Sequence, residues 1–90
     1  MNIKGRLSQI DATQELSGGF RKREFIIETE GEYPQLIRFE LLKDKVDIID
    51  SFQTGKIIDV HFNIQGRNFN GKVYNNLIAW KVLGDSGFGN

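Results

Sequence analysis

A short stretch towards the C-terminal end of the chain contains the residues that are best suited to bind a ligand. Residues 66–76, GRNFNGKVYNN, hold two cations and two aromatic rings: Arg67, Lys72, Phe69 and Tyr74. Guanidinium and ammonium groups bind phosphates, and aromatic rings stack on nucleobases. These groups can act together only if the fold places them on one surface.

The dipeptide at the centre of this stretch predicts a tight β-hairpin. Asn70-Gly71 is the strongest short signal for such a turn, because both of its residues must adopt positive φ. A two-residue turn places Phe69 opposite Lys72, and Arg67 then lies opposite Tyr74. Since side chains alternate between the two faces of a sheet, the same register predicts a core face made of Phe62, Ile64, Leu77 and Ala79.

The opposite face of the hairpin, here called the outer face, carries aromatic rings, cations and amides. Its members are His61, Asn63, Gln65, Arg67, Phe69, Lys72, Tyr74, Asn76, Ile78 and Trp80. Rings for bases, cations for phosphates and amides for base edges compose a platform for single-stranded nucleic acid. Two alternatives stay open: hairpin stabilisation through cross-strand pairs alone, and a subunit interface that includes Ile78 and Trp80. A bulge in place of the tight turn would exchange the two faces.

The residues with catalytic potential lack partners. The single histidine, His61, stands in the middle of a predicted strand, where a packed or solvated role is the usual one. The alternating acids at 28, 30 and 32, and the pair Asp47 and Asp50, have no base or nucleophile near them in sequence. With no cysteine and one histidine, no metal-ligand set can be assembled. We therefore expect a protein that is not an enzyme and uses no metal or cofactor.

The composition indicates one globular domain. Ninety residues support a single hydrophobic core, and 39% hydrophobic with 27% charged residues is ordinary for a folded chain. No apolar run reaches the length of a membrane span, and the N-terminus lacks the apolar stretch of a signal peptide. We expect a soluble, cytoplasmic protein without membrane contact.

The formal net charge of zero hides an uneven distribution of charge. The segment 28–50 holds seven acids and three bases, whereas 4–23 holds five bases and two acids, and 56–82 holds four bases and one acid. A polyanionic partner is therefore possible only if the fold brings the two basic segments together.

Five strands are expected to position these residues, within 2–12, 20–29, 35–42, 56–66 and 72–82. Between the third and fourth, Val46, Ile49 and Phe52 recur about every third residue, which predicts one short amphipathic helix with Asp44 as N-cap and Gly55 as its end. This order is that of an OB-fold, a five-stranded Greek-key barrel. The rival is another small barrel or a β-sandwich with an incidental helix. We expect the domain to span 1–83 and a flexible tail to span 84–90.

Two longer stretches carry a resemblance to known families. Residues 22–52, KREFIIETEGEYPQLIRFELLKDKVDIIDSF, and 62–82, FNIQGRNFNGKVYNNLIAWKV, are similar to short bacterial and phage OB-fold proteins catalogued as a domain of unknown function. Residues 39–82 also resemble the second half of bacterial single-stranded DNA-binding proteins, mainly in architecture. The resemblance implies single-strand binding without strong sequence preference and assembly as a dimer or tetramer. It also implies that Phe69, and more loosely Tyr74, stack on bases.

The same resemblance implies that a loop before the second strand, GGFRKR, lies along the bound strand. The leading hypothesis is thus a non-catalytic OB-fold protein that binds single-stranded DNA, or RNA, as a homodimer or homotetramer. The expected stacking residues are Phe69, Tyr74, Phe20 and Trp80, and the expected phosphate contacts are Arg21, Lys22, Arg23, Arg67 and Lys72. The alternative is a protein–protein adaptor that uses the same outer face.

Overall fold

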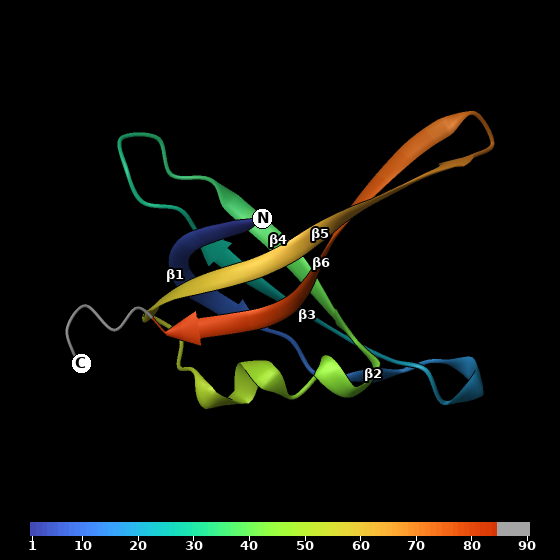
Figure 1. Ribbon diagram of the computed structural model, residues 1–90, viewed down its shortest axis with the longest axis horizontal. Coiled ribbons are helices and arrows are strands. Elements are labelled where there is room, and N and C mark those ends of the chain that lie inside the picture. The colour runs from blue at the N-terminus through green and yellow to red at the C-terminus, as the bar shows by residue number, and fades with distance from the viewer. Residues whose placement is uncertain (85–90) are drawn as a thin grey trace.

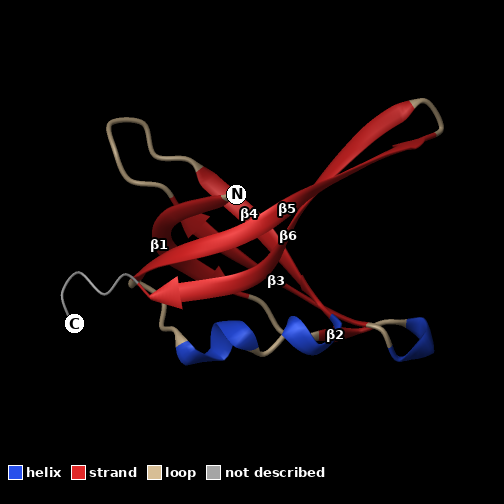
Figure 2. Cartoon of the chain, in the orientation of Figure 1, coloured by secondary structure: helices blue, strands red, loops and turns tan. Residues whose placement is uncertain are grey.

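The computed structural model describes residues 1–84, and its strands wrap into a barrel with short helical turns along one side (Figures 1 and 2). The strands are β1 (Asn2–Ile10), β2 (Gln14–Glu15), β3 (Arg21–Glu28), β4 (Leu36–Leu42), β5 (Ile57–Phe69) and β6 (Lys72–Gly84). The helical turns are the 3₁₀ helices η1 (Ser17–Gly19), η2 (Lys43–Lys45) and η3 (Ile48–Ser51).

Five of the strands close the barrel. They are hydrogen-bonded in the order β1-β5-β6-β4-β3, and β1 also pairs with β3, which completes the ring. Every pairing is antiparallel except that of β4 with β6, which is parallel at Glu40 and Ile78. The two-residue strand β2 only extends the sheet beyond β3. A five-stranded ring with a helical segment between β4 and β5 confirms the predicted OB-fold.

The helical segment after β4 differs in detail from the single amphipathic helix that the pattern predicted. It consists of η2 and η3 in succession, and the side chain of Asp44 makes no capping hydrogen bond. Val46 and Ile49 are nevertheless fully buried, and Phe52 packs against the core. A 3₁₀ helix has three residues per turn, so a strict three-residue spacing suits it better than the 3.6-residue period of an α-helix.

The core of the barrel is small and wholly apolar among the described residues. It contains Leu7, Phe25, Ile27, Phe39, Leu41, Val46, Ile49, Ile58, Val60, Phe62 and Ala79. Strand β1 contributes to it through a bend, because its register with β3 shifts between Leu7 and Gln9. This bulge lets one strand pair with β5 in its first half and with β3 in its second.

Strands β5 and β6 continue well beyond the barrel as a two-stranded hairpin, the arm at the upper right of Figure 1. The predicted register is confirmed, with Ile64 opposite Leu77 and Phe62 opposite Ala79. Phe62 and Ala79 are buried, but the side chain of Ile64 is 53% exposed. The prediction of a continuous core face is therefore wrong at Ile64, because the hairpin has already left the barrel at that point. Strand β6 ends at Gly84, and residues 85–90 of the predicted tail lie outside the described residues.

Candidate nucleic-acid interface

The tip of the hairpin is a tight turn of the predicted kind. Asn70 has φ 52° and Gly71 has φ 81°, so both turn residues lie in the left-handed region. The side-chain oxygen of Asn68 accepts a hydrogen bond of 3.2 Å from the backbone N–H of Gly71. The turn consists of two residues only, and the assignment of faces that depends on it is confirmed from the tip to the pair of Phe62 and Ala79.

The four residues on which the sequence hypothesis rests lie on one face of the hairpin. Phe69 pairs with Lys72 at the tip, and Arg67 pairs with Tyr74 one step nearer the barrel. The side chain of Phe69 is 61% exposed and that of Tyr74 is 44% exposed. Within residues 1–84 neither Arg67 nor Lys72 forms an ion pair. Rings and charges at this tip are thus available to a partner.

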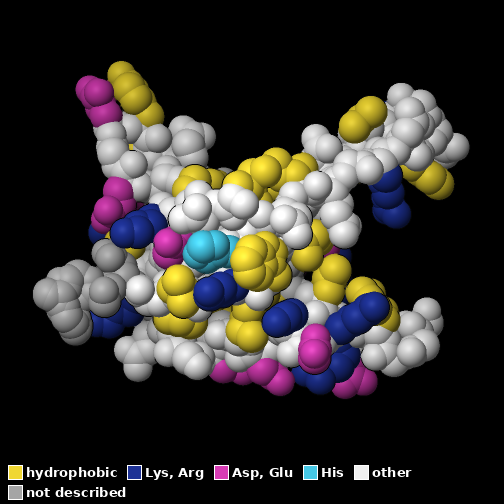
Figure 3. Space-filling model, viewed as in Figure 1, with side chains coloured by type: hydrophobic (Ala, Val, Ile, Leu, Met, Phe, Trp, Pro, Cys, Tyr) yellow, Lys and Arg dark blue, Asp and Glu magenta, His cyan; other side chains and the backbone are white. Residues whose placement is uncertain are grey.

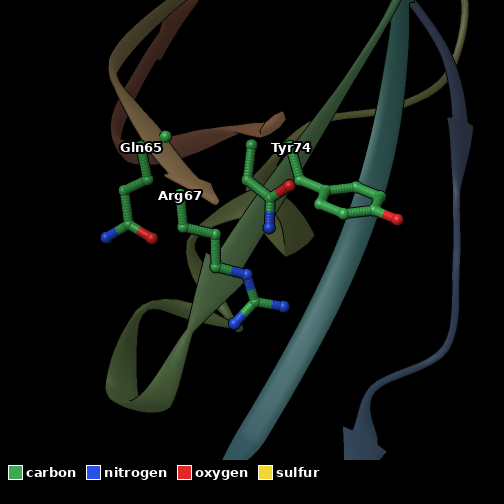
Figure 4. Close-up of a pocket in the computed structure, with 5 residues that line it drawn as sticks. Gln65, Arg67 and Tyr74 are labelled. Atoms are coloured by element: carbon green, nitrogen blue, oxygen red, sulfur yellow. The ribbon is translucent and has the colours of Figure 1, made fainter. Parts of the chain in front are cut away.

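The outer face of the hairpin is hollowed where it approaches the barrel. A pocket of about 310 Å³ is lined there by Gln65, Gly66, Arg67, Tyr74 and Asn76. In Figure 4 the side chains of Gln65 and Arg67 extend from the same strand in the same direction, while the ring of Tyr74 projects from the neighbouring strand. An amide, a guanidinium and a phenol ring therefore border one small volume.

The hairpin and the loop that carries β2 and η1 project towards the same end of the molecule (Figure 1). Figure 3 shows a hollow between these two arms, with Lys and Arg side chains on both of its borders. The dark-blue side chains under the hairpin lie on the side that faces the hollow. The hairpin of the second basic segment and the loop of the first thus project towards the same end of the molecule, which was the condition for a polyanionic partner.

The loop residues at the second border are more engaged than the sequence suggested. The ammonium group of Lys43 lies 5.9 Å from the centre of the Phe20 ring, within cation–π distance. Arg21 lies 3.6 Å from a carboxylate oxygen of Asp47, and both side chains are exposed. Lys22 lies 3.8 Å from carboxylates of both Glu24 and Glu40. Each side chain therefore already has an intramolecular neighbour.

Arg23 occupies a structural position. Its Nε donates to the carbonyl oxygen of Asp11 at 2.8 Å, and its Nη1 donates to the carbonyl oxygen of Val46 at 3.1 Å and to Asp50 Oδ1 at 2.9 Å. Its side chain is only 14% exposed. These bonds tie the end of the β1 segment and the helical segment to β3.

Trp80 lies on the outer face but away from the hairpin tip. It is the unpaired residue of a bulge, since His61 is opposite Lys81 while Phe62 is opposite Ala79. Its ring is 5.5 Å from that of His61, and its side chain is 43% exposed. The histidine Nε2 is buried, makes no hydrogen bond, and lies 3.9 Å from Asp59 Oδ2. Trp80 thus lies beside His61 and remains partly exposed.

Two features of this surface escaped the candidate set drawn from the sequence. Lys43 adopts a positive φ of 58° at the end of β4 and reaches Phe20, and nothing in its sequence neighbourhood predicts a contact across 23 positions. Gln65 and Asn76 were placed on the outer face as amides, but only the hairpin geometry shows that they share a pocket with Arg67 and Tyr74.

Other kinds of site find little support in the part of the chain that the structure describes. Residues 1–84 contain no group of three or more His, Cys, Asp or Glu side chains placed to hold a metal ion. None of the helices in the same range is long and apolar enough to cross a membrane.

Solved structures of similar shape are OB-fold proteins. A mitochondrial single-stranded DNA-binding protein of S. cerevisiae, Rim1, matches with a TM-score of 0.78 and 11% identity over 94% of this chain and 92% of its own. The second single-stranded DNA-binding protein of Mycobacterium smegmatis matches at 0.69 with 9% identity, over 94% and 84%. The dimeric N-terminal domain of PriB from Thermoanaerobacter tencongensis matches at 0.65 with 12% identity, over 91% and 90%. At these identities the likeness establishes the fold.

The family of the chain follows from its sequence. A search of the curated proteins found no match. The model of a protein family described as "Domain of unknown function (DUF3127)" matches residues 2–83. The chain belongs to this family, and the expected membership in a family of unknown function with an architecture like that of single-stranded DNA-binding proteins is confirmed.

Proposed function

We propose that this protein is a non-catalytic binder of single-stranded DNA that receives the strand in the hollow between the hairpin and the β2–η1 loop. The observation that carries the proposal is the exposed row of Phe69, Lys72, Arg67 and Tyr74 on one face of a hairpin that has no core to cover it. Rings stack on bases without regard to sequence, and cations neutralise phosphates, so this row suits a single strand better than a duplex.

The predicted phosphate contacts fall into groups according to whether each cation already has an intramolecular partner. Arg67 and Lys72 have no ion-pair partner in residues 1–84 and are the primary contacts in this proposal. Arg21 and Lys22 are secondary contacts, since a phosphate must compete with Asp47 or with Glu24 and Glu40. Arg23 has a structural role in this proposal, because its side chain donates hydrogen bonds to the carbonyl oxygens of Asp11 and Val46. Phe20 stacks on a base only if Lys43 moves from its ring.

A titration of fluorescent oligo-dT at low salt tests the proposal. We expect wild type to bind and the Phe69→Ala/Tyr74→Ala double variant to bind at least tenfold more weakly, since each stacked base contributes about 1–3 kcal/mol. Val73→Ala is the matched control, because Val73 is also exposed but lies on the other face of the same hairpin. An absence of binding by wild type, or equal binding by wild type and the double variant, contradicts the assignment to this face.

The second candidate function is that of a protein–protein adaptor. The fluorescence of Trp80 distinguishes this function from the binding of single-stranded DNA. Trp80 is the only tryptophan of the chain, so fluorescence excited selectively from tryptophan reports on its surroundings alone. In the proposed complex Trp80 belongs to the strand path, and its emission falls when oligo-dT is added. Emission that changes with protein concentration and is insensitive to oligonucleotide assigns Trp80 to a protein interface.

We further propose that the protein works as a homo-oligomer. The argument is the small core together with the exposed apolar side chains of Trp80, Leu83 and Met1 outside the hairpin. A dimer also places two hairpins on one strand, which raises the apparent affinity of a chain with no net charge. Sedimentation equilibrium tests this, and a monomer across the micromolar range contradicts it.

A further inference from the structure

The pocket on the outer face is built from two neighbouring cross-strand pairs. Gln65 lies opposite Asn76, and Arg67 lies opposite Tyr74 two positions further along. Side chains that face each other across an antiparallel pair have Cβ atoms only about 5 Å apart. Two amides, one guanidinium and one phenol ring therefore border the same volume of about 310 Å³, which is at the lower end of the range for small-molecule sites.

The two amides of the pocket are not used by the fold. Within residues 1–84 neither Gln65 nor Asn76 forms a side-chain hydrogen bond, unlike Asn68, which closes the turn, and Asn2, which donates to Asp59. Each amide offers one carbonyl acceptor and one NH₂ donor. Together the two amides present hydrogen-bond donors and acceptors whose partners come from water or from a ligand.

From this geometry we infer that the pocket is a base-reading subsite, in which Gln65 and Asn76 hydrogen-bond the edge of one adenine in the bound strand. The inference rests on the proposed single-strand binding and adds a base preference to it. A side-chain amide matches adenine with two hydrogen bonds on its N6/N7 edge, because on that edge only adenine presents a donor, N6–H, next to an acceptor, N7. Tyr74 stacks on the base, and Arg67 holds the neighbouring phosphate.

The arrangement of the outer face separates affinity from selectivity. Phe69 and Lys72 at the tip offer a ring and a charge, which every nucleotide can satisfy. The amides lie nearer the barrel, and their hydrogen bonds depend on the identity of the base. A strand that runs from the tip of the hairpin towards the barrel thus first contacts groups that bind any nucleotide and then contacts groups that distinguish between bases.

Competition among short oligonucleotides of one length tests the inference. The probes are oligo-dT and three dT oligomers in which the same few internal positions carry A, C or G. We expect wild type to prefer the A-containing probe over oligo-dT by about fivefold, the lower end of the discrimination from one bidentate contact in an exposed site. In Gln65→Ala/Asn76→Ala the preference disappears while binding to oligo-dT persists.

Two matched variants complete the experiment. Asn75→Ala removes an amide from the other face of the same strand and should retain the preference for A. Phe69→Ala should weaken the binding of all four probes alike. Equal binding of the four probes by wild type, preference for C or G, or a preference that survives loss of both amides overturns the subsite and leaves single-strand binding intact. If wild type binds none of the probes, the proposed function itself fails.

Discussion

At the scale of single residues, two arginines two positions apart have different environments. Arg21 is exposed and has one carboxylate neighbour at 3.6 Å, whereas Arg23 is largely buried and donates to two backbone carbonyls and one carboxylate. An exposed ion pair contributes little to stability, because water and salt screen it. Removing the hydrogen-bond donor of a carbonyl oxygen in a poorly solvated place lowers the free energy of unfolding by more. Arg21 can therefore exchange its carboxylate partner at little cost, whereas Arg23 is committed to the fold.

We predict that Arg23→Ala lowers the free energy of unfolding by about 1–3 kcal/mol, since the carbonyl oxygens of Asp11 and Val46 lose a donor. Arg21→Ala is the control and should change it by less than about 0.5 kcal/mol. Urea denaturation followed by circular dichroism measures both. Equal losses for the two variants would contradict the structural role of Arg23.

At the scale of elements, the hairpin and the barrel differ in what holds them together. In the barrel, β5 buries alternate side chains from Ile58 to Phe62, whereas residues 63–69 of the same strand are all exposed. A two-stranded hairpin without a covered face is only marginally stable by itself. The hairpin is therefore a long, locally opening element anchored at its base in a rigid ring.

Hydrogen exchange should show this division. We expect backbone amides in 64–76 to exchange through local opening, at rates that do not change when mild urea lowers the global stability, whereas amides of the β3 and β4 core exchange only on global unfolding. Added oligo-dT should slow the exchange of 64–76. Protection of the hairpin equal to that of the barrel would show that another chain covers it.

Closure of the barrel depends on one position in β1. Gly5 is buried where β1 passes between β5 and β3, and a Cβ there would lie 2.9 Å from the carbonyl oxygen of Glu28 and 2.9 Å from Ile27 Cδ1. Such contacts force the backbone to shift, so Gly5→Ala should destabilise the protein by about 1–3 kcal/mol.

The matched control for Gly5 is Gly66→Ala in the hairpin. A Cβ at Gly66 would lie 3.1 Å from the side-chain oxygen of Asn75, which can rotate away, and 4.0 Å from the carbonyl oxygen of Tyr74, which is an ordinary contact. The midpoint of thermal unfolding should fall clearly for the first variant and stay close to wild type for the second. A neutral Gly5→Ala would mean that β1 does not need this close approach to β3.

At the scale of the whole molecule, a net charge of zero coexists with Lys and Arg side chains on both borders of the hollow. Several acids of the middle segment form ion pairs with cations of the loop. Arg67 and Lys72 of the hairpin, in contrast, have no acidic partner in residues 1–84. Binding to a polyanion then depends on a few local charges instead of on a general attraction. Its dependence on salt should be correspondingly modest.

The salt dependence gives a quantitative test. Each phosphate contact on a single strand contributes about 0.7 to the slope of log K against log salt, so Arg67→Ala/Lys72→Ala should reduce the slope by about 1.4. Lys56→Ala is the control, because Lys56 precedes β5 at the end away from the hairpin, and its loss should leave the slope unchanged. A slope that the double variant does not alter would place the phosphates elsewhere.

The sequence by itself determined the five barrel strands and the register of the hairpin from its tip to Phe62 and Ala79. Alternation of apolar residues set the strands, and Asn70-Gly71 set the pairing of the hairpin, because a two-residue turn allows only one register. The same pattern placed Phe69 and Tyr74 on the face away from the core. It failed at Ile64, since alternation shows which face a residue takes but not how far the barrel extends beneath it.

Only the tertiary structure decided which charges are free and which groups share a pocket. The partners of Arg23 lie at Asp11, Val46 and Asp50, and the ring of Phe20 meets Lys43, all contacts between segments that are distant in the chain. Closure of β1 onto β3 and of β4 onto β6 brings these segments together. Local patterns depend on backbone geometry over a few residues, whereas pairing of charges and hollowing of a surface depend on how the strands close the ring.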